Sequence, residues 1–314
     1  MSTLNDMLSI LGDYYSDYSD AAILGNPQTP HLVIDGHNLL SLNQVPGVTI
    51  ETDTAEDEIN AQLTVSAGTQ LVNPIHLCIG ILAPQGRQNI NLRTALEDNS
   101  RASLVAHCLF PNVQAAQHHM NAVIELGTGA QLYYSEGHYH GMSGNTEVVP
   151  KAKLRVGPNG RYISDFSLTS GRVGRLTLDY VVEVDDNAVV EITARIFGHK
   201  TDQIKIKDEV FLNGKHSRGL IKTRVAVEDQ ASSEVVGITH GNAEGARGHM
   251  DCLEIVRGEA TATAEPIVKV THPLAKVTHE AAVGTVDQRQ LETLMARGLS
   301  PEQAVDVVIT GMLS

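Results

Sequence analysis

Apolar residues recur along the chain with two different periods. Near the N-terminus four of them have the i, i+3, i+4, i+7 spacing of one helix face, which predicts a helix over about residues 1–24. These residues are Leu4, Met7, Leu8 and Leu11. From about residue 31 to residue 284 the period changes to two, and Gly, Asn and Asp interrupt the runs. The longer region is therefore predicted to be all β.

A turn followed by a strand recurs inside this β region. The turns end at Ala130, Gly160, Ala188, Ala231 and Ala260. Three of the four steps between them are 28 to 30 residues long, and the third step is 43 residues. Near-equal spacing is typical of stacked repeats, so we predict a β-solenoid with an insertion in the long step, at FLNGKHSRG. The alternative is that such turns recur by chance in a β-protein of another kind.

Helical signals return after about residue 285. Two pairs have the spacing of capping boxes, and a glycine between them stands where a helix would end: Asp287 with Gln290, Ser300 with Gln303, and Gly298. A hairpin of two short helices cannot bury both of its faces, so the second face is a candidate partner surface. We divide the chain into an N-terminal helical segment (1–30), a β core (31–284) and a C-terminal helical hairpin (285–314).

Composition narrows the kind of core that the chain can build. Aromatic residues make up only 4% of the 314 residues and Trp is absent, although 42% are hydrophobic. The interior must therefore consist mainly of Val, Ile, Leu and Ala, which suits stacked, repetitive β layers. A chain of this length can bury a sizeable core without metals or disulfides.

Charge and cysteine content exclude several classes of function. The 37 acidic and 23 basic residues give a net charge of −14, which disfavours nucleic acid as a partner. We find no signal peptide and no apolar run long enough to span a membrane. Three widely spaced cysteines suit reduced thiols in the cytoplasm.

No GxxxxGK[ST] loop and no catalytic triad spacing is present, so we expect a protein that is not an enzyme, with any nucleotide hydrolysis in a partner.

Three segments carry a resemblance to a known family. Residues 273–313 closely resemble the C-terminal signature of SufB and SufD, the scaffold subunits of the SUF iron–sulfur assembly system. KHSRGLIKT at 215–223 and ARGHMDCLEIV at 246–256 are similar to two further segments of that family, in the same order and spacing. The segment 106–126 is similar more weakly. The resemblance extends over roughly residues 105 to 313.

The resemblance implies a fold, partners and a role. It implies a right-handed parallel β-helix, a dimer formed along β-helix edges, and a SufC-type ABC ATPase bound to the C-terminal helices. The chain is short and shows no sign of two specialised subunits, so we expect a homodimer in which one scaffold type fills both roles. A transient iron–sulfur cluster, a sulfur donor and apo-protein acceptors belong to the same implied function.

The resemblance also implies cluster ligands. Cys252 matches a proposed thiolate ligand, and His279 and Glu280 match residues proposed for cluster assembly, so we predict a cluster between Cys252 of one subunit and His279 or Glu280 of the other. Strand alternation would send His279 and Glu280 to opposite faces unless a bend intervenes. Thr278 stands where SufB-type proteins carry another acid. Without the family, a buried apolar cysteine and a surface His–Glu pair are the ordinary interpretations.

The two remaining cysteines have different expected roles. Cys108 matches a SufB-type cysteine proposed to receive sulfur, and charged neighbours His107, His118 and His119 would lower its pKa. Cys78 has no counterpart, and we assign it to the core.

The segment EGHYHGMSGNTE places His138 and His140 on one strand face, with Glu147 after them. These histidines are candidates for lining the interior sulfur path or binding iron, and a plain structural role is equally open. Two rival functions also stay open. One is a metal-dependent enzyme that uses His138, His140 and Glu147. The other is a structural or carbohydrate-binding solenoid, which the scarcity of aromatic residues disfavours.

Overall fold

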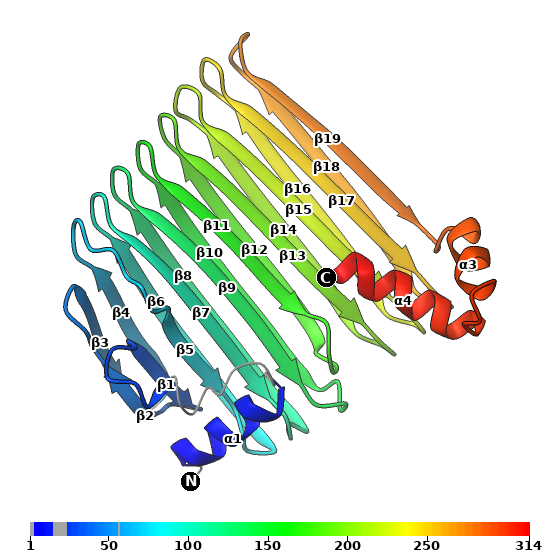
Figure 1. Ribbon diagram of the computed structural model, residues 1–314, viewed down its shortest axis with the longest axis horizontal. Helices are drawn as coiled ribbons and strands as arrows, with labels where there is room; N and C mark the ends of the chain where they lie inside the picture. The colour runs from blue at the N-terminus through cyan, green and yellow to red at the C-terminus, as the bar shows by residue number, and fades with distance from the viewer. Residues whose placement is uncertain (1–2, 15–23, 56) are drawn as a thin grey trace.

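The alternating region folds into two facing β-sheets that form a parallel β-solenoid of about eight turns (Figure 1). The computed structural model describes residues 3–14, 24–55 and 57–314. The ten-stranded sheet has the order β19 (Lys276–Gly284), β17 (Arg247–Val256), β15 (Arg218–Val227), β13 (Val189–Gly198), β11 (Arg161–Leu168), β9 (Gln131–His140), β7 (Arg101–Phe110), β5 (Ile75–Gly80), β1 (His31–Asp35) and β2 (Asn38–Asn43).

The second sheet has nine strands and faces the first. Its order is β18 (Thr261–Val270), β16 (Ser232–Gly241), β14 (Gln203–Leu212), β12 (Gly174–Val184), β10 (Thr146–Val156), β8 (Ala115–Leu126), β6 (Gln85–Leu96), β4 (Ile59–Val65) and β3 (Val48–Thr54). The predicted solenoid is thus confirmed, and strands run from His31 to Gly284.

Each coil contributes one strand to each sheet and stacks in register on the coil before it. In β14 and β16, for example, Gln203 pairs with Ser232, which lies 29 residues further along the chain. Alternate residues of every central strand point into the narrow space between the sheets, where Val, Ile, Leu and Ala form a single continuous core. The same core also holds a few aromatic side chains, among them Tyr162, Phe166 and Tyr180.

The predicted insertion at FLNGKHSRG is wrong. These residues form the end of β14, a turn, and the start of β15. Ala188 precedes a strand of the ten-stranded sheet, whereas Ala231 precedes a strand of the nine-stranded sheet. The 43-residue step therefore spans one whole coil and the half coil between the two sheets. The turns at both edges of the solenoid end in a small buried residue, so the turn pattern in the sequence did not distinguish one edge from the other.

The two ends of the solenoid differ. At the N-terminal end, β2 and β3 pair antiparallel with β1 and β4 and terminate both sheets. At the C-terminal end, β18 and β19 are the outermost strands, and no further described strand covers them. Val270 and Val283, at the ends of these strands, are 48% and 47% exposed. The C-terminal end thus presents two free strand edges and apolar side chains to its surroundings.

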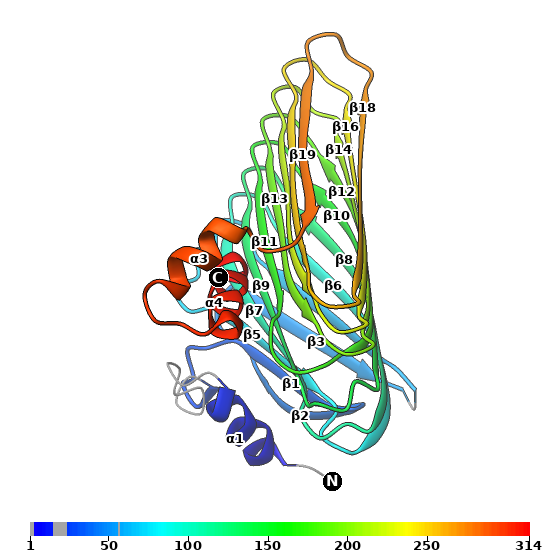
Figure 2. The ribbon, with the colours of Figure 1, turned by 90° about the vertical axis from the view of Figure 1, so that its right-hand side faces the viewer.

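Helices cover part of the outer face of the ten-stranded sheet (Figure 2). Helix α1 (Leu4–Tyr14) buries Met7 and Leu11 in a cluster with Cys78, which confirms the assignment of this cysteine to the core. The remainder of the helix predicted over residues 1–24 falls on 15–23, outside the described residues. No described helix has the length and apolarity that a membrane crossing would require.

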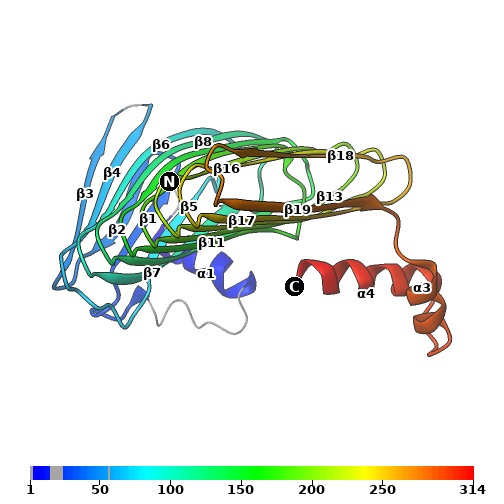
Figure 3. The same ribbon diagram turned by 90° about the horizontal axis from the view of Figure 1, so that it is seen from above.

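The predicted C-terminal hairpin is confirmed. The Asp287 side chain accepts hydrogen bonds from two backbone N–H groups at the start of α3 (Gln288–Met295), and Ser300 with Gln303 forms a reciprocal capping box at α4 (Pro301–Leu313). Helix α4 packs Ile309 and Leu313 against the outer face of β15 and β17. Helix α3 has no buried residue and lies beyond the end of α4 (Figure 3).

Candidate functional site

The C-terminal end of the solenoid places Cys252 and His279 on the same face. Strand β17 pairs in register with β19, so that Met250 lies opposite His279 and Cys252 lies opposite Ala281. Met250 and Cys252 are buried and point between the two sheets. Because paired residues in a parallel sheet face the same way, His279 also faces the interior, one coil closer to the open end than Cys252.

Glu280 faces the opposite way, toward the outer surface. Its partner in the register is Asp251, whose carboxylate forms an ion pair with Arg224 on that outer face. Strand β19 runs from Lys276 to Gly284 without an irregularity in its pairing, so no bend brings Glu280 back to the side of His279. The structure therefore brings Cys252 and His279 to one face and leaves Glu280 on the other.

Burial controls the protonation of the Cys252 thiol. The side chain is 4% exposed, and burial raises its pKa to about 11. The nearby carboxyl groups of Glu254, Asp208 and Asp251 add to this rise, and a hydrogen bond with Thr223 acts in the opposite direction. Cys252 is thus a neutral thiol at neutral pH, and a metal must displace its proton in order to bind.

Glu254 is an interior residue beside Cys252 that the sequence reasoning missed. It stands two residues after Cys252 on β17, faces the same interior and is fully buried. Ser233 on β16 donates a hydrogen bond to one carboxyl oxygen, while the other oxygen has no partner among the described residues. Burial raises the pKa of Glu254 to about 7. The available signal was a glutamate at a position where the alternation of ARGHMDCLEIV requires an apolar side chain.

The raised pKa of Glu254 predicts a pH dependence of stability. The folded chain keeps this proton up to about pH 7, whereas the unfolded side chain releases it near its ordinary pKa of 4.5. This group therefore contributes about 3 kcal/mol to the free energy of unfolding, fully present below pH 4.5. The contribution is lost as the pH rises through 7. We expect Glu254→Gln to reduce the loss of unfolding free energy between about pH 5 and about pH 8, measured by urea titration.

A matched control is Glu265→Gln, which changes an exposed glutamate on β18. This variant should keep the pH dependence of the wild type. An unchanged slope in Glu254→Gln, with both variants folded, would show that Glu254 is not protonated in the native interior at neutral pH.

A second group of buried polar side chains lies in the early coils. Cys108 on β7 pairs with His138 on β9 in the strand register, and Ala106 pairs with Glu136. The ligand atoms of Cys108, Glu136 and His138 all lie within 4.8 Å of one another, and the three side chains are buried. Nε2 of His138 lies 2.7 Å from a carboxylate oxygen of Glu136. Glu136 is the member of this group that the motif EGHYHGMSGNTE did not single out.

His107 and His118, which were expected to be charged neighbours of Cys108, are neutral at neutral pH. Burial lowers the pKa of His107 to about 4 and that of His118 to about 3, and it lowers the pKa of His140 well below its usual value. Burial and the neighbouring Glu136 carboxylate raise the pKa of Cys108 well above its ordinary value. The imidazoles of His107 and His118 therefore do not activate this thiol, because burial removes the water that would stabilise their charge.

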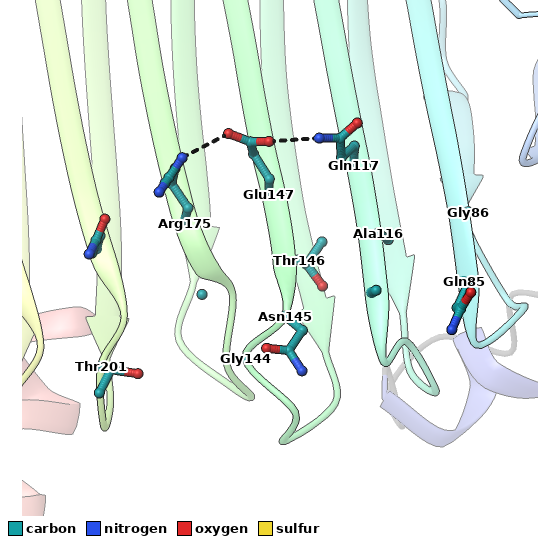
Figure 4. Close-up of a pocket in the computed structure, with 13 residues that line it drawn as sticks. Gln85, Gly86, Ala116, Gln117, Gly144, Asn145, Thr146, Glu147, Arg175 and Thr201 are labelled. Atoms are coloured by element: carbon teal, nitrogen blue, oxygen red, sulfur yellow. Dashed lines mark hydrogen bonds and ion pairs between the residues drawn. The ribbon is translucent and has the colours of Figure 1, made fainter.

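The set His138, His140 and Glu147 does not form one site. His138 and His140 point into the interior of the solenoid, whereas Glu147 lies on the outer surface of the nine-stranded sheet. There Glu147 accepts a hydrogen bond from Gln117 at 3.1 Å and contacts Arg175 at 3.3 Å, in an open groove (Figure 4). A sheet separates Glu147 from the two imidazoles, so the structure provides no metal site built from these three residues.

Comparison with known proteins yields a consistent set of matches. Residues 80–312 match the family model described as SUF system FeS cluster assembly, SufBD core domain. An iron-sulfur cluster assembly SufBD family protein of Methanocaldococcus jannaschii is 35% identical over 315 residues, covering 100% of this chain and 99% of that protein. A second one, from Pyrococcus horikoshii, is 31% identical and covers 96% of this chain and 91% of its own length. Both similarities therefore extend over nearly the entire solenoid and its flanking helices.

Proposed function

The chain belongs to the SufBD family of iron–sulfur cluster assembly proteins, and we propose that it is a scaffold on which a nascent cluster is built at a dimer interface. It does not itself hydrolyse a nucleotide in this proposal. A SufC-type ABC ATPase supplies that activity, a sulfur donor supplies sulfide, and apo-proteins in the cytoplasm receive the product. The cluster is cargo that the scaffold holds only until transfer.

One observation carries the proposal. Cys252 and His279 face the same interior on the last two coils of the ten-stranded sheet, directly below an end that no described strand covers. Thiolate is the main protein ligand of iron–sulfur clusters, and imidazole replaces it on one iron in some of them. The arrangement thus offers suitable ligands at a place where a large inorganic group can enter and leave.

The same end is suited to pairing with a second copy of the chain. The free edges of β18 and β19 carry unpaired backbone donors and acceptors, which can pair with another strand edge. A two-fold axis at this end would extend both sheets across the interface and cover Val270 and Val283. It would also double the supply of ligands. In the proposed dimer, Cys252 of one subunit acts with His279 or Glu280 of the partner.

The C-terminal hairpin is the proposed docking surface for the ATPase. Helix α4 is held on the solenoid by Ile309 and Leu313, whereas α3 has no buried residue. Leu291, Leu294 and Met295 lie on one side of α3 and are only partly covered. An apolar helix face that its own chain leaves open can bind a groove on a partner.

The assembly role of the dimer is tested by Val283→Lys. Because Val283 is already 47% exposed, lysine should be tolerated in the isolated subunit, but it would place two ammonium groups in the apolar interface. We expect a folded monomer by size-exclusion chromatography with light scattering. After anaerobic reconstitution it should contain less than about a tenth of the wild-type iron and acid-labile sulfide.

Val72→Lys is the matched control, because Val72 is 95% exposed in a loop near the opposite end. It should remain a dimer with a full cluster content. A dimeric, cluster-loaded Val283→Lys variant would overturn the proposed interface, and a wild-type protein that binds iron without sulfide would overturn the scaffold role.

The proposed role of Cys108 as sulfur acceptor stays a prediction. Its thiol lies inside the solenoid and is neutral at rest, so sulfur transfer would require both access to the interior and a group that takes the thiol proton. The surroundings of this cysteine support a different interpretation as well.

A further inference from the structure

We propose that Cys108, Glu136 and His138 form a buried binding site for one divalent transition metal ion of the Fe²⁺ or Zn²⁺ class. Their ligand atoms lie within 4.8 Å of one another. The site does not depend on the cluster-building role, because it is formed within one chain and lies in the early coils, whereas Cys252 and His279 are in the last two (Figure 1).

The donor set fits such an ion in type and in charge. A thiolate, an imidazole and a carboxylate are the ligands that Zn²⁺ and Fe²⁺ take in proteins. Thiolate and carboxylate together carry two negative charges, so a divalent ion leaves the site electrically neutral. Electrical neutrality matters here because each of the three residues is buried, and an uncompensated charge in such a place is costly.

Neighbouring side chains hold the ligands in place. The Tyr134 hydroxyl donates a hydrogen bond of 2.7 Å to the second carboxylate oxygen of Glu136. Nε2 of His140 lies 3.5 Å from Nδ1 of His138. Partners of this kind orient ligands at metal sites and fix the tautomer of the coordinating imidazole.

His118 adds a nitrogen lone pair beside this group of ligands. The amide nitrogen of Gln88 donates to the carbonyl oxygens of Gly36 and Gly80, at 2.5 and 3.1 Å, which orients its oxygen toward Nδ1 of His118 at 2.8 Å. That nitrogen must therefore carry the proton. Nε2 of His118 is left as a buried acceptor without a partner among the described residues, and its ring lies 6.3 Å from that of His138.

A metal accounts for features that a packing role does not explain. An ordinary core would fill these positions with apolar residues, and a buried nitrogen without a hydrogen bond is destabilising. A bound ion would ionise the Cys108 thiol, releasing its proton, and would separate Glu136 from His138 as both turned toward it.

The test uses the full-length chain with Co²⁺ as a spectroscopic probe for the site. The protein is produced in medium supplemented with Co²⁺, purified anaerobically under reducing conditions, and examined by metal analysis and absorption spectroscopy. We expect about one Co²⁺ per chain, no acid-labile sulfide, and a thiolate-to-cobalt charge-transfer band. Cys108→Ala, which keeps a small apolar side chain in the core, should lose the band and at least about nine-tenths of the metal.

Two cysteine variants serve as matched controls. Cys78→Ala and Cys252→Ala each remove another buried thiol and should retain both the metal and the band. Glu136→Gln preserves the shape of the side chain but removes its charge, and it should weaken Co²⁺ binding at least about 10-fold. A purely structural role would leave the metal content of this last variant unchanged.

Three results would overturn the site. They are a folded wild-type protein that takes up no Co²⁺, a charge-transfer band that persists in Cys108→Ala, and a band that disappears in Cys252→Ala instead. The third result would assign the metal to the C-terminal end. A different outcome separates this site from the proposed function: if the protein binds metal at Cys108 but builds no cluster, the metal site stands and the proposed scaffold function is rejected.

Discussion

Cys252→Ser is expected to give a folded dimer that assembles no iron–sulfur cluster. Serine has nearly the same size as cysteine, so the buried position below the last coil should accept it with little change in packing. Its hydroxyl does not ionise in the protein and is a poor ligand for iron, whereas thiolates hold these clusters. Iron and acid-labile sulfide after anaerobic reconstitution should fall to less than about a tenth of the wild-type content.

Cys78→Ser is the matched control, because Cys78 is an equally buried thiol under helix α1 and has no proposed role in assembly. It should retain the cluster. Wild-type absorbance and sulfide content in Cys252→Ser would remove this cysteine from the site.

A complementation experiment decides whether the ligands come from one chain or two. A heterodimer of a Cys252→Ser subunit with a subunit carrying both His279→Ala and Glu280→Ala contains one intact site if ligands are shared across the interface. It contains none if each site lies within one chain. We expect about half of the wild-type cluster content, because clusters take roughly four protein ligands and the end of one chain offers a single thiol.

The reciprocal heterodimer must give the opposite result. A wild-type subunit paired with one that carries all three substitutions has no intact shared site, but it keeps one intact site of the single-chain kind. Shared ligands therefore predict no cluster in this pair, and half the wild-type content would show that Cys252 acts with His279 of its own chain.

The second large effect is expected at the C-terminal hairpin. Deleting residues 286–314 should abolish binding of the SufC-type ATPase, measured by pull-down and by titration calorimetry. Since the deletion also uncovers Ala226 and Ile255 under α4, a point substitution separates docking from folding. Met295→Glu places a charge on the 41% exposed side chain of α3 and should weaken ATPase binding at least about 10-fold.

Met142→Glu is the control for this substitution, because Met142 is 71% exposed in the turn between β9 and β10, four coils before β17. Full ATPase affinity is expected there. Retained binding in the truncated protein with a folded solenoid would move the docking surface elsewhere, and helix α1 would be the next candidate.

Much of the architecture was predictable because it depends on local and repetitive features. Alternation with a period of two assigns each side chain to a face, and a coil of 28 to 30 residues repeats that assignment along the stack. Asp287 and Ser300 cap their helices through hydrogen bonds to residues of the first turn, so each helix start could be recognised from a few neighbouring residues. Turn spacing alone failed in one place, because the two edges of the solenoid use turns with the same kind of terminal residue.

The sites depended on information that a single strand does not contain. Alternation predicted that His279 and Glu280 diverge, but only the register between β17 and β19 placed His279 on the side of Cys252. Similarly, Glu147 follows the two histidines in sequence, yet the register between β7 and β9 brings Cys108 and Glu136 to His138 instead.

The sequence by itself thus determined the solenoid, its flanking helices and the alternation of side chains along each strand. The tertiary structure alone decided which ligands meet and in which protonation state they do so. A shift of one residue between coils would move every side chain to the other face. The residues that meet across neighbouring coils can therefore be identified only once the register is known. Burial then sets the charge of each group, as in the neutral His118 and the thiol of Cys108, and burial is a property of the whole stack.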